Sequence, residues 1–221
     1  IARDMADLIA DPFRAARLVL HLRQEGITDD GVLKAMETID RGAFVDTPGL
    51  DKLAFEDCVL PIPCGQIVPR PAVTGQLLQA LRIKQMREAR ILLVGVGSGY
   101  TAALAAQLGA DVFAMDRFRR LCDAARRRML YLGLGNVAVR HGDGLTGWPE
   151  RGPYDRILLT GAVDEVPDVL LRRWSRDARG PFSGDSRGLQ ALFAKASAHS
   201  YRGMTFAGTL RGLPRLRVTG S

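Results

Sequence analysis

A glycine-rich segment followed by a distant acid is the part of this sequence whose residue types and spacing can do chemistry. The segment reads Gly95-Val96-Gly97-Ser98-Gly99, and Asp116 lies 21 residues after Gly95. Glycines at such a turn let the backbone approach a ligand closely. An acid about 20 residues further on can accept hydrogen bonds from both hydroxyls of a ribose. The pattern predicts a nucleoside-binding site.

A second acid, Asp143, stands in Gly142-Asp143-Gly144 after a later apolar segment. At the carboxyl end of a strand it would lie at the ligand-binding edge of an open α/β sheet, within reach of an adenine amino group. A dinucleotide site would usually have a further glycine where Tyr100 stands. The shorter pattern is more usual for S-adenosylmethionine.

Alternating apolar runs and amphipathic stretches predict the strands and helices that would position these residues. The run Ile91–Val94 is typical of a buried parallel strand. The other predicted strands are 112–115, 137–139 and 156–159, with helices at 100–108, about 118–132 and 166–174, and weaker strands at 190–196 and 203–210. This order predicts an α/β fold with a mostly parallel sheet and an antiparallel C-terminal part.

The first 70 residues have a different character. A helix is expected over 4–25. Thr28-Asp29-Asp30 offers N-cap candidates for a second helix, which carries Val32, Leu33, Met36 and Ile39. Residues 41–71 are proline-rich and irregular, and a helix is expected from Ala72 to about Leu81. We therefore expect a helical and loop appendage over 1–70, packed on an α/β domain over 71–221.

The composition is that of a soluble globular protein, with 47% hydrophobic and 25% charged residues among 221. The net charge of +7 comes mainly from arginine, which would suit nucleic acid, an acidic substrate, or no partner at all. Six arginines are expected on or beside the solvated face of the helix that follows Asp116: Arg117, Arg119, Arg120, Arg126, Arg127 and Arg128.

Three cysteines at no metal-ligand spacing give no reason to expect a metal site. The N-terminal residues lack the layout of a secretory signal, and no apolar run is long enough to cross a membrane. We expect a cytoplasmic protein without a membrane partner.

Several short motifs, in order along the chain, resemble the protein-L-isoaspartate (D-aspartate) O-methyltransferase family. The resemblance covers about residues 14 to 175. The motifs that carry it are Leu22-Arg23-x-x-Gly26-Ile27, Arg41-x-x-Phe44-Val45, Leu60-Pro61-Ile62 with Gly65-Gln66 and Pro71, Gly95 to Tyr100, Leu132-Gly133-Leu134-x-Asn136-Val137, Gly142-Asp143-Gly144, Gly147-Trp148 and Pro153-Tyr154-Asp155. Together, and especially with the loop from Leu60 to Pro71, they are specific.

The resemblance implies a class I S-adenosylmethionine-dependent methyltransferase of Rossmann-like fold. It implies S-adenosylmethionine bound by Gly95, Val96, Gly97, Ser98, Gly99, Asp116, Arg117, Asp143 and Gly144. The implied substrate is a damaged protein or peptide, whose isoaspartyl carboxylate is methylated. The ester then closes to a succinimide, which can reopen as normal aspartate.

Three positions depart from the family pattern. Ile67 and Pro69 stand where the family loop carries threonine and an active-site serine, and Leu93 stands where it carries an acid that helps hold the cofactor. Pro69 also lacks a backbone N–H. Losing a donor from a catalytic centre costs about 100-fold in rate or more. Arg70 is the candidate to bind the substrate carboxylate instead.

Three functions remain open at this point. The first is an S-adenosylmethionine-dependent O-methyltransferase acting on isoaspartyl or related carboxylates. The second is a protein of the same fold that has lost catalysis and serves as a binding or regulatory subunit. The third, a nucleic-acid methyltransferase, is less favoured, because the strand end Thr160-Gly161 lacks a target-base motif.

Overall fold

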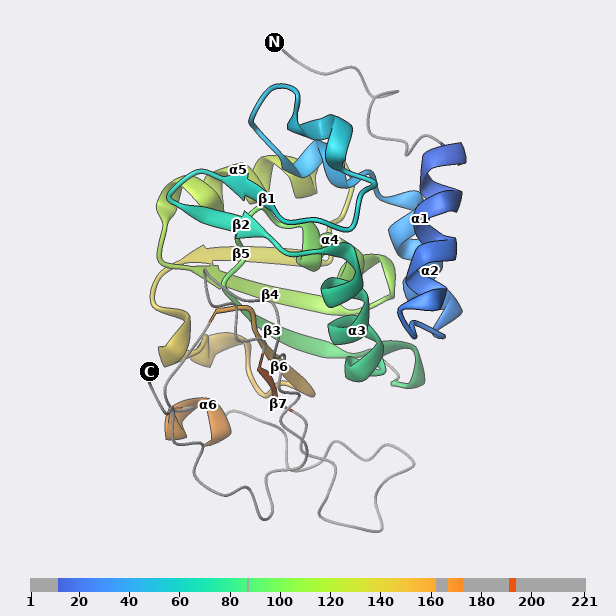
Figure 1. Ribbon diagram of the computed structural model, residues 1–221. Helices are drawn as coiled ribbons and strands as arrows, with labels where there is room; N and C mark the ends of the chain where they lie inside the picture. The colour runs from blue at the N-terminus through green and yellow to red at the C-terminus, as the bar shows by residue number, and fades with distance from the viewer. Residues whose placement is uncertain (1–11, 87, 162–166, 173–190, 194–221) are drawn as a thin grey trace, which may run out of the picture.

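A five-stranded parallel sheet with helices on both faces forms the body of the protein (Figure 1). The computed structural model describes residues 12–86, 88–161, 167–172 and 191–193. The helices are α1 (Pro12–Gln24), α2 (Asp30–Thr38), α3 (Pro71–Leu81), α4 (Tyr100–Gln107), α5 (Arg119–Tyr131) and α6 (Asp168–Arg172). The strands are β1 (Leu60–Ile62), β2 (Gln66–Val68), β3 (Arg90–Val94), β4 (Asp111–Asp116), β5 (Val137–His141), β6 (Arg156–Leu159) and β7 (Ala191–Phe193).

The strand order in the large sheet is β5-β4-β3-β6-β7, and every neighbouring pair is parallel. The chain runs from β3 outward to β5 and then returns to β6 on the other side of β3, so the switch point lies between β3 and β6. Open α/β sheets bind ligands at the carboxyl ends of the strands near such a point. Strand β7 corrects one expectation. Within the predicted strand 190–196, residues 191–193 pair parallel to β6, not antiparallel. Adjacent parallel strands need a crossover connection, and α6 lies in this one.

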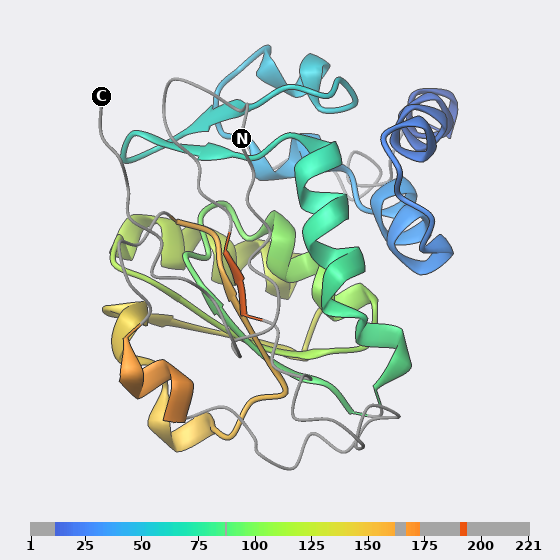
Figure 2. The ribbon, with the colours of Figure 1, turned by 60° about the horizontal axis from the view of Figure 1, so that its bottom comes forward.

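Side chains alternate between two cores, as the two-residue period of a strand requires. On β3, Ile91 and Leu93 belong to a large core that includes residues of α2, α3, α4 and α5. Leu92 points to a smaller core on the other face, together with Tyr154 and Leu170. Figure 2 shows α3, α4 and α5 on one side of the sheet and α6 on the other.

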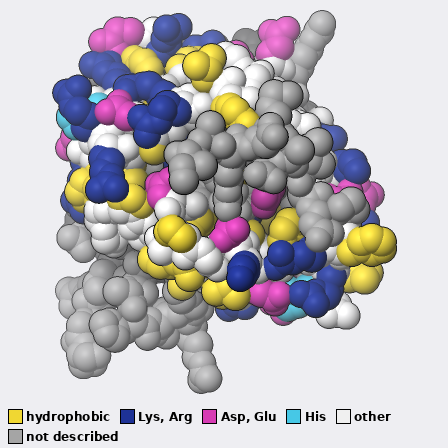
Figure 3. All heavy atoms as spheres, turned by 90° about the horizontal axis from the view of Figure 1, so that it is seen from above, with side chains coloured by type: hydrophobic (Ala, Val, Ile, Leu, Met, Phe, Trp, Pro, Cys, Tyr) yellow, Lys and Arg dark blue, Asp and Glu magenta, His cyan; other side chains and the backbone are white. Residues whose placement is uncertain are grey.

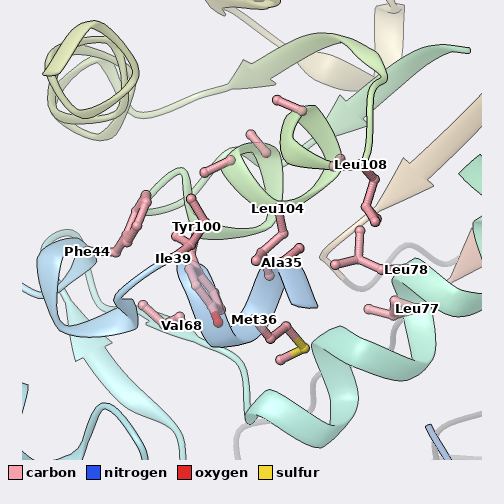
Figure 4. Packing of buried hydrophobic residues seen from close by; sticks show 14 of the residues in the cluster. Ala35, Met36, Ile39, Phe44, Val68, Leu77, Leu78, Tyr100, Leu104 and Leu108 are labelled. Atoms are coloured by element: carbon pink, nitrogen blue, oxygen red, sulfur yellow. The ribbon is translucent and has the colours of Figure 1, made fainter. Parts of the chain in front are cut away.

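The N-terminal helices share the large core with the sheet. Asp29 accepts hydrogen bonds from the backbone of Gly31 and Val32 and so caps α2, as its sequence position predicts. Figure 4 shows Ala35 and Met36 of α2 packed among side chains of α3 and α4. The predicted helix over 4–25 is α1 from Pro12 onwards, and residues 1–11 lie outside the described part.

Residues 41–70 were expected to be irregular, yet they contain two 3-10 turns, Arg41–Phe44 and Leu50–Leu53, and the antiparallel hairpin β1–β2. Each hairpin strand has three residues, too few for a periodic pattern to stand out. The hairpin buries Leu60, Ile62 and Val68 and crosses above the sheet (Figure 1).

The arginines of α5 are mostly solvated, as predicted. Arg119, Arg120, Arg126 and Arg127 are exposed, but Arg128 is not: only 14% of its side chain is accessible. The side chain of Arg128 lies toward the glycine segment and hydrogen-bonds to Ser98 there. Figure 3 shows Lys and Arg side chains in several groups on one face of the molecule, with Asp and Glu among them. Among the helices of the described ranges, none is both long and apolar enough to cross a membrane.

Candidate functional site

The glycine segment forms a tight turn between β3 and α4, where the sequence places it. Gly95, Gly97 and Gly99 all have positive φ, at 93°, 54° and 92°. A Cβ on Gly95 would lie 2.3 Å from the Thr160 hydroxyl oxygen, so no side chain fits there. That hydroxyl donates to the Gly95 carbonyl oxygen at 2.6 Å. Only glycine at position 95 allows the backbone to take this path.

Asp116 ends β4 and binds the glycine turn directly. Its Oδ2 accepts a hydrogen bond from the Gly97 N–H at 2.9 Å, and its Oδ1 accepts one from the Phe118 N–H at 3.0 Å. The residue is 7% exposed. A carboxylate offers about four lone-pair positions, so acceptor capacity remains for two ribose hydroxyls. The arrangement fits the predicted role.

Asp143 lies next to Asp116 because β4 and β5 are neighbours. Asp116 is in register with His141, and the Gly142 N–H donates to the Asp116 carbonyl at 2.9 Å. Asp143 is exposed, and its Oδ1 accepts from the Leu145 N–H at 2.9 Å. The parallel sheet therefore brings together two acids that are 27 positions apart in the sequence.

Two further predicted cofactor residues, Arg117 and Gly144, lie beside these acids. Arg117 is exposed, with its guanidinium 4.9 Å from the ring centroid of Phe118. Gly144 is buried, and a Cβ there would be 2.6 Å from a methyl carbon of Val94. Gly144 is thus required by close packing of the turn against the end of β3.

The polar groups at this edge are mainly acceptors and suit a neutral or cationic nucleoside better than a phosphate. Two carboxylates face this edge, and the glycine turn spends one of its N–H groups on Asp116. S-adenosylmethionine has ribose hydroxyls and an adenine amino group to donate, and no phosphate. Within the described ranges, no cluster of three His, Cys, Asp or Glu side chains could hold a metal ion.

Leu93 gives the cofactor nothing polar. Its side chain is 1% exposed and packs in the large core beneath the turn. The apolar core therefore takes over the position where the family carries an acid, so the charged end of a cofactor would depend on other groups.

The β1–β2 hairpin lies over the glycine turn. A Cβ on Gly97 would be 3.8 Å from the Cδ1 atom of Ile62, the inward residue at the end of β1. Ile67 is on the opposite face of the hairpin and is 36% exposed. Pro69 follows β2, and its carbonyl oxygen accepts a hydrogen bond from Arg41. The three departures thus differ in environment. Leu93 lies in the core, Ile67 is exposed to solvent, and the backbone of Pro69 is held by Arg41.

Arg70 is held by a carboxylate of this chain. Its Nε donates to Oδ2 of Asp57 at 2.8 Å, and its Nη2 contacts the same oxygen. The Asp57 side chain is 7% exposed and also accepts from the Ala72 N–H, at the start of α3. The ion pair occupies one edge of the Arg70 guanidinium and reduces its attraction for a substrate carboxylate. None of its hydrogen bonds within the described ranges uses Nη1.

Two arginines hold this site together through contacts that the sequence pattern does not reveal. Arg41 is 1% exposed and binds backbone carbonyls of the segment leading into and out of the hairpin. Burial lowers the pKa of its guanidinium, and Tyr100 acts in the opposite direction. The motif Arg41-x-x-Phe44-Val45 marked its position but not its partners.

Arg128 joins the glycine turn to the 3-10 turn Arg41–Phe44. It donates to the carbonyls of Ser98 at 3.1 Å and Ala43 at 3.0 Å, and to Asp46 at 2.6 Å. Phe44 and Tyr100 meet edge to face nearby, with centroids 5.3 Å apart (Figure 4). Burial lowers the pKa of Arg128, and Asp46 acts against that effect.

Known proteins match most of the chain. A protein 45% identical over 167 residues is the protein-L-isoaspartate O-methyltransferase of Azorhizobium caulinodans, with 76% of each chain covered. The protein of the same name from Paracoccus denitrificans is 44% identical over 158 residues, with 72% of each chain covered.

Solved structures agree with the fold. A protein-L-isoaspartate O-methyltransferase structure superposes with a TM-score of 0.67 at 28% identity, covering 73% of this chain and 52% of that one. A Plasmodium falciparum β-aspartate methyltransferase in complex with S-adenosyl-L-homocysteine gives a TM-score of 0.65 at 20% identity, covering 83% and 84%. The second likeness speaks for the fold alone.

The fold is therefore that of a class I methyltransferase, as predicted from the alternating pattern and the motifs. The model of the family described as protein-L-isoaspartate (D-aspartate) O-methyltransferase matches residues 14–178, which is most of the chain. With the curated relatives above, this match settles the grouping: the chain belongs to the protein-L-isoaspartate (D-aspartate) O-methyltransferase family.

Proposed function

We propose that this protein transfers the methyl group of S-adenosylmethionine to the free carboxylate of isoaspartyl residues in damaged proteins or peptides. The observation that carries the proposal is the joint placement of the glycine turn, Asp116 and Asp143 at one edge of the sheet, under the hairpin. The curated relatives that support it bear this activity in their names.

The proposed cofactor site consists of the turn Gly95–Gly99, with Asp116 for the ribose, Asp143 for the adenine amino group, and Arg117 and Gly144 beside them. When bound, S-adenosylmethionine supplies a methyl group on a sulfonium, which is an excellent leaving group. Asp116 binds and orients the nucleoside while keeping the turn closed through Gly97. The turn itself fixes the cofactor position by close backbone approach.

The substrate needs little acid–base help. A carboxylate with an ordinary pKa near 4 is already ionised at neutral pH. The protein must align the carboxylate oxygen with the methyl group and exclude competing water. Alignment alone can lower the barrier by several kcal/mol. Residues 60–70 are the part of the chain proposed to do this, with Arg70 Nη1 as the candidate donor to the carboxylate.

A second candidate function is a binding protein that no longer catalyses methyl transfer. Three observations favour it: Leu93 is buried in the apolar core, Pro69 offers no N–H, and Arg70 is already paired with Asp57. The glycine turn, with its positive φ angles and its hydrogen bond to Asp116, is present in either case, so both candidates are expected to bind the cofactor.

One experiment separates the candidates. S-adenosylhomocysteine is titrated by calorimetry, and methyl transfer to a synthetic isoaspartyl peptide is then measured against the same peptide with normal aspartate. Binding with selective transfer supports the enzyme. Binding without transfer supports the binding protein, and failure to bind at millimolar ligand refutes both.

We place the protein in the cytoplasm, which its three free cysteines support.

A further inference from the structure

Arg41 is an unusual residue in this fold because its buried guanidinium is bound mainly to backbone oxygens. Nη2 donates to the carbonyls of Cys58 at 2.6 Å and Pro69 at 2.9 Å, with Val68 further away at 3.5 Å. Nη1 donates to the carbonyl of Ala54 at 3.3 Å, with Glu56 at 3.5 Å. One side chain therefore reaches the chain on both sides of the hairpin.

The position of these carbonyls matters more than their number. Leu60 pairs with Val68 at the open end of the hairpin, and Cys58 and Pro69 flank that end. Nη2 of Arg41 thus bridges the two points where the hairpin joins the rest of the chain. A hairpin of two three-residue strands is marginal by itself and depends on such outside support.

The hairpin in turn covers the glycine turn through Ile62, and its last residues lead to Pro69 and Arg70. Any shift of its open end would move Ile62 relative to Gly97 and move the backbone carrying Pro69. Misplacing reacting groups by about 1 Å can cost about 100-fold in rate. The rate of methyl transfer is therefore expected to depend on how far the hairpin lies above the turn.

We propose that Arg41 is a positioning residue for the substrate carboxylate: it fixes the open end of the β1–β2 hairpin above the cofactor turn. This inference rests on the proposed function for its catalytic consequence. Its structural half, the anchoring of the hairpin, stands on the contacts alone. Arginine suits the task because its planar guanidinium offers five N–H donors in fixed directions, whereas a lysine ammonium is a compact charge with three donors on a flexible stem.

The test compares Arg41→Met and Arg41→Lys with the wild-type protein. Arg23→Met is the matched control, because Arg23 lies in the same N-terminal part but makes an exposed ion pair with Asp30. In Arg41→Met we expect kcat/KM for an isoaspartyl peptide to fall about 10- to 100-fold, mainly through kcat. Arg41→Lys should fall between, since it can keep one carbonyl contact. The control should behave as wild type.

Two measurements distinguish positioning from loss of folding. S-adenosylhomocysteine should bind the Arg41→Met protein with full stoichiometry and a Kd within about twofold of wild type, since the hydrogen bonds of Arg41 described above go to the hairpin segment and not to Asp116 or the turn. Amide hydrogen exchange in residues 60–68 should be at least about tenfold faster, with exchange in β3 and β4 unchanged. A merely destabilised protein would instead lose binding sites and exchange faster throughout.

Unchanged exchange in residues 60–68 of Arg41→Met would overturn the proposal. So would faster exchange there with no change in kcat/KM. If the wild-type protein transfers no methyl group, the proposed function fails, and the exchange measurement still decides whether Arg41 anchors the hairpin. Where the Met variant does not fold, the Lys variant carries the same comparison.

Discussion

Replacing Asp116 by alanine should weaken cofactor binding and loosen the turn at once. The carboxylate accepts from the N–H groups of Gly97 and Phe118, and the residue is 7% exposed. Each hydrogen bond to a buried charged acceptor contributes about 1.5–3 kcal/mol, and part of this returns if water reaches the freed N–H. We expect a loss of about 2–4 kcal/mol in the free energy of unfolding.

The effect on the ligand can be separated from the effect on folding. Two ribose hydroxyls would lose their acceptor, which costs about 1–3 kcal/mol, or about 5- to 150-fold in the Kd for S-adenosylhomocysteine. Asp116→Asn keeps the volume and one acceptor oxygen, so its loss should be smaller. Asp123→Ala removes a half-buried acid of α5 and is the control.

Calorimetry measures the Kd and the number of sites, and urea unfolding measures stability on the same samples. The ribose role of Asp116 is refuted if Asp116→Ala binds at full stoichiometry with the wild-type Kd. If affinity falls but Asp123→Ala shows the same fall, the effect is general electrostatics and the proposed contact is wrong.

Three further predictions concern packing and ionisation. Gly144→Ala should lower the free energy of unfolding by about 1–3 kcal/mol, because its Cβ would meet a β3 valine at 2.6 Å; Gly135→Ala, with open space around it, should change little in the same urea titration. Tyr100→Phe should raise the urea midpoint at pH 7, since the buried hydroxyl has no hydrogen-bond partner within the described ranges. Burial raises the pKa of Tyr100 above its usual 10, so the folded state keeps the proton and loses stability as pH rises beyond about 10. The Phe variant should lose less stability over that range, and parallel curves of unfolding free energy against pH for the two proteins would contradict this. Burial likewise raises the pKa of the Cys122 thiol, so mass spectrometry after iodoacetamide treatment at mildly alkaline pH should find exposed Cys64 modified first; equal rates would show that Cys122 is not packed as described.

The sequence predicted best what depends on local pattern. The runs at Ile91–Val94, 112–115 and 137–139 became β3, β4 and β5, and the parallel pairing of β4 with β5 brings Asp116 and Asp143 to one edge, as expected. Parallel strands buried on both faces have continuous apolar sequences, so few alternatives compete.

What escaped prediction depends on contacts between distant residues. Asp57 forms an ion pair with Arg70, 13 positions away in the sequence, and Arg128 donates to the carbonyl of Ala43, 85 positions away. An arginine in a basic run looks solvated unless its partners are known, so Arg128 was misassigned. The hairpin was hidden by its prolines and its short strands.

The contacts of Arg41 have a consequence for how the segment between residues 59 and 68 can vary. A side chain that joins Cys58 to Pro69 closes a loop as a noncovalent cross-link, with the ends held at a fixed separation. The entropy cost of closing a loop grows only logarithmically, by about 0.6 kcal/mol for each doubling of its length. The tip of the hairpin at 63–65 can therefore gain residues at little cost to the anchored ends. Substrate preference could be altered there by insertion, without rebuilding the cofactor turn.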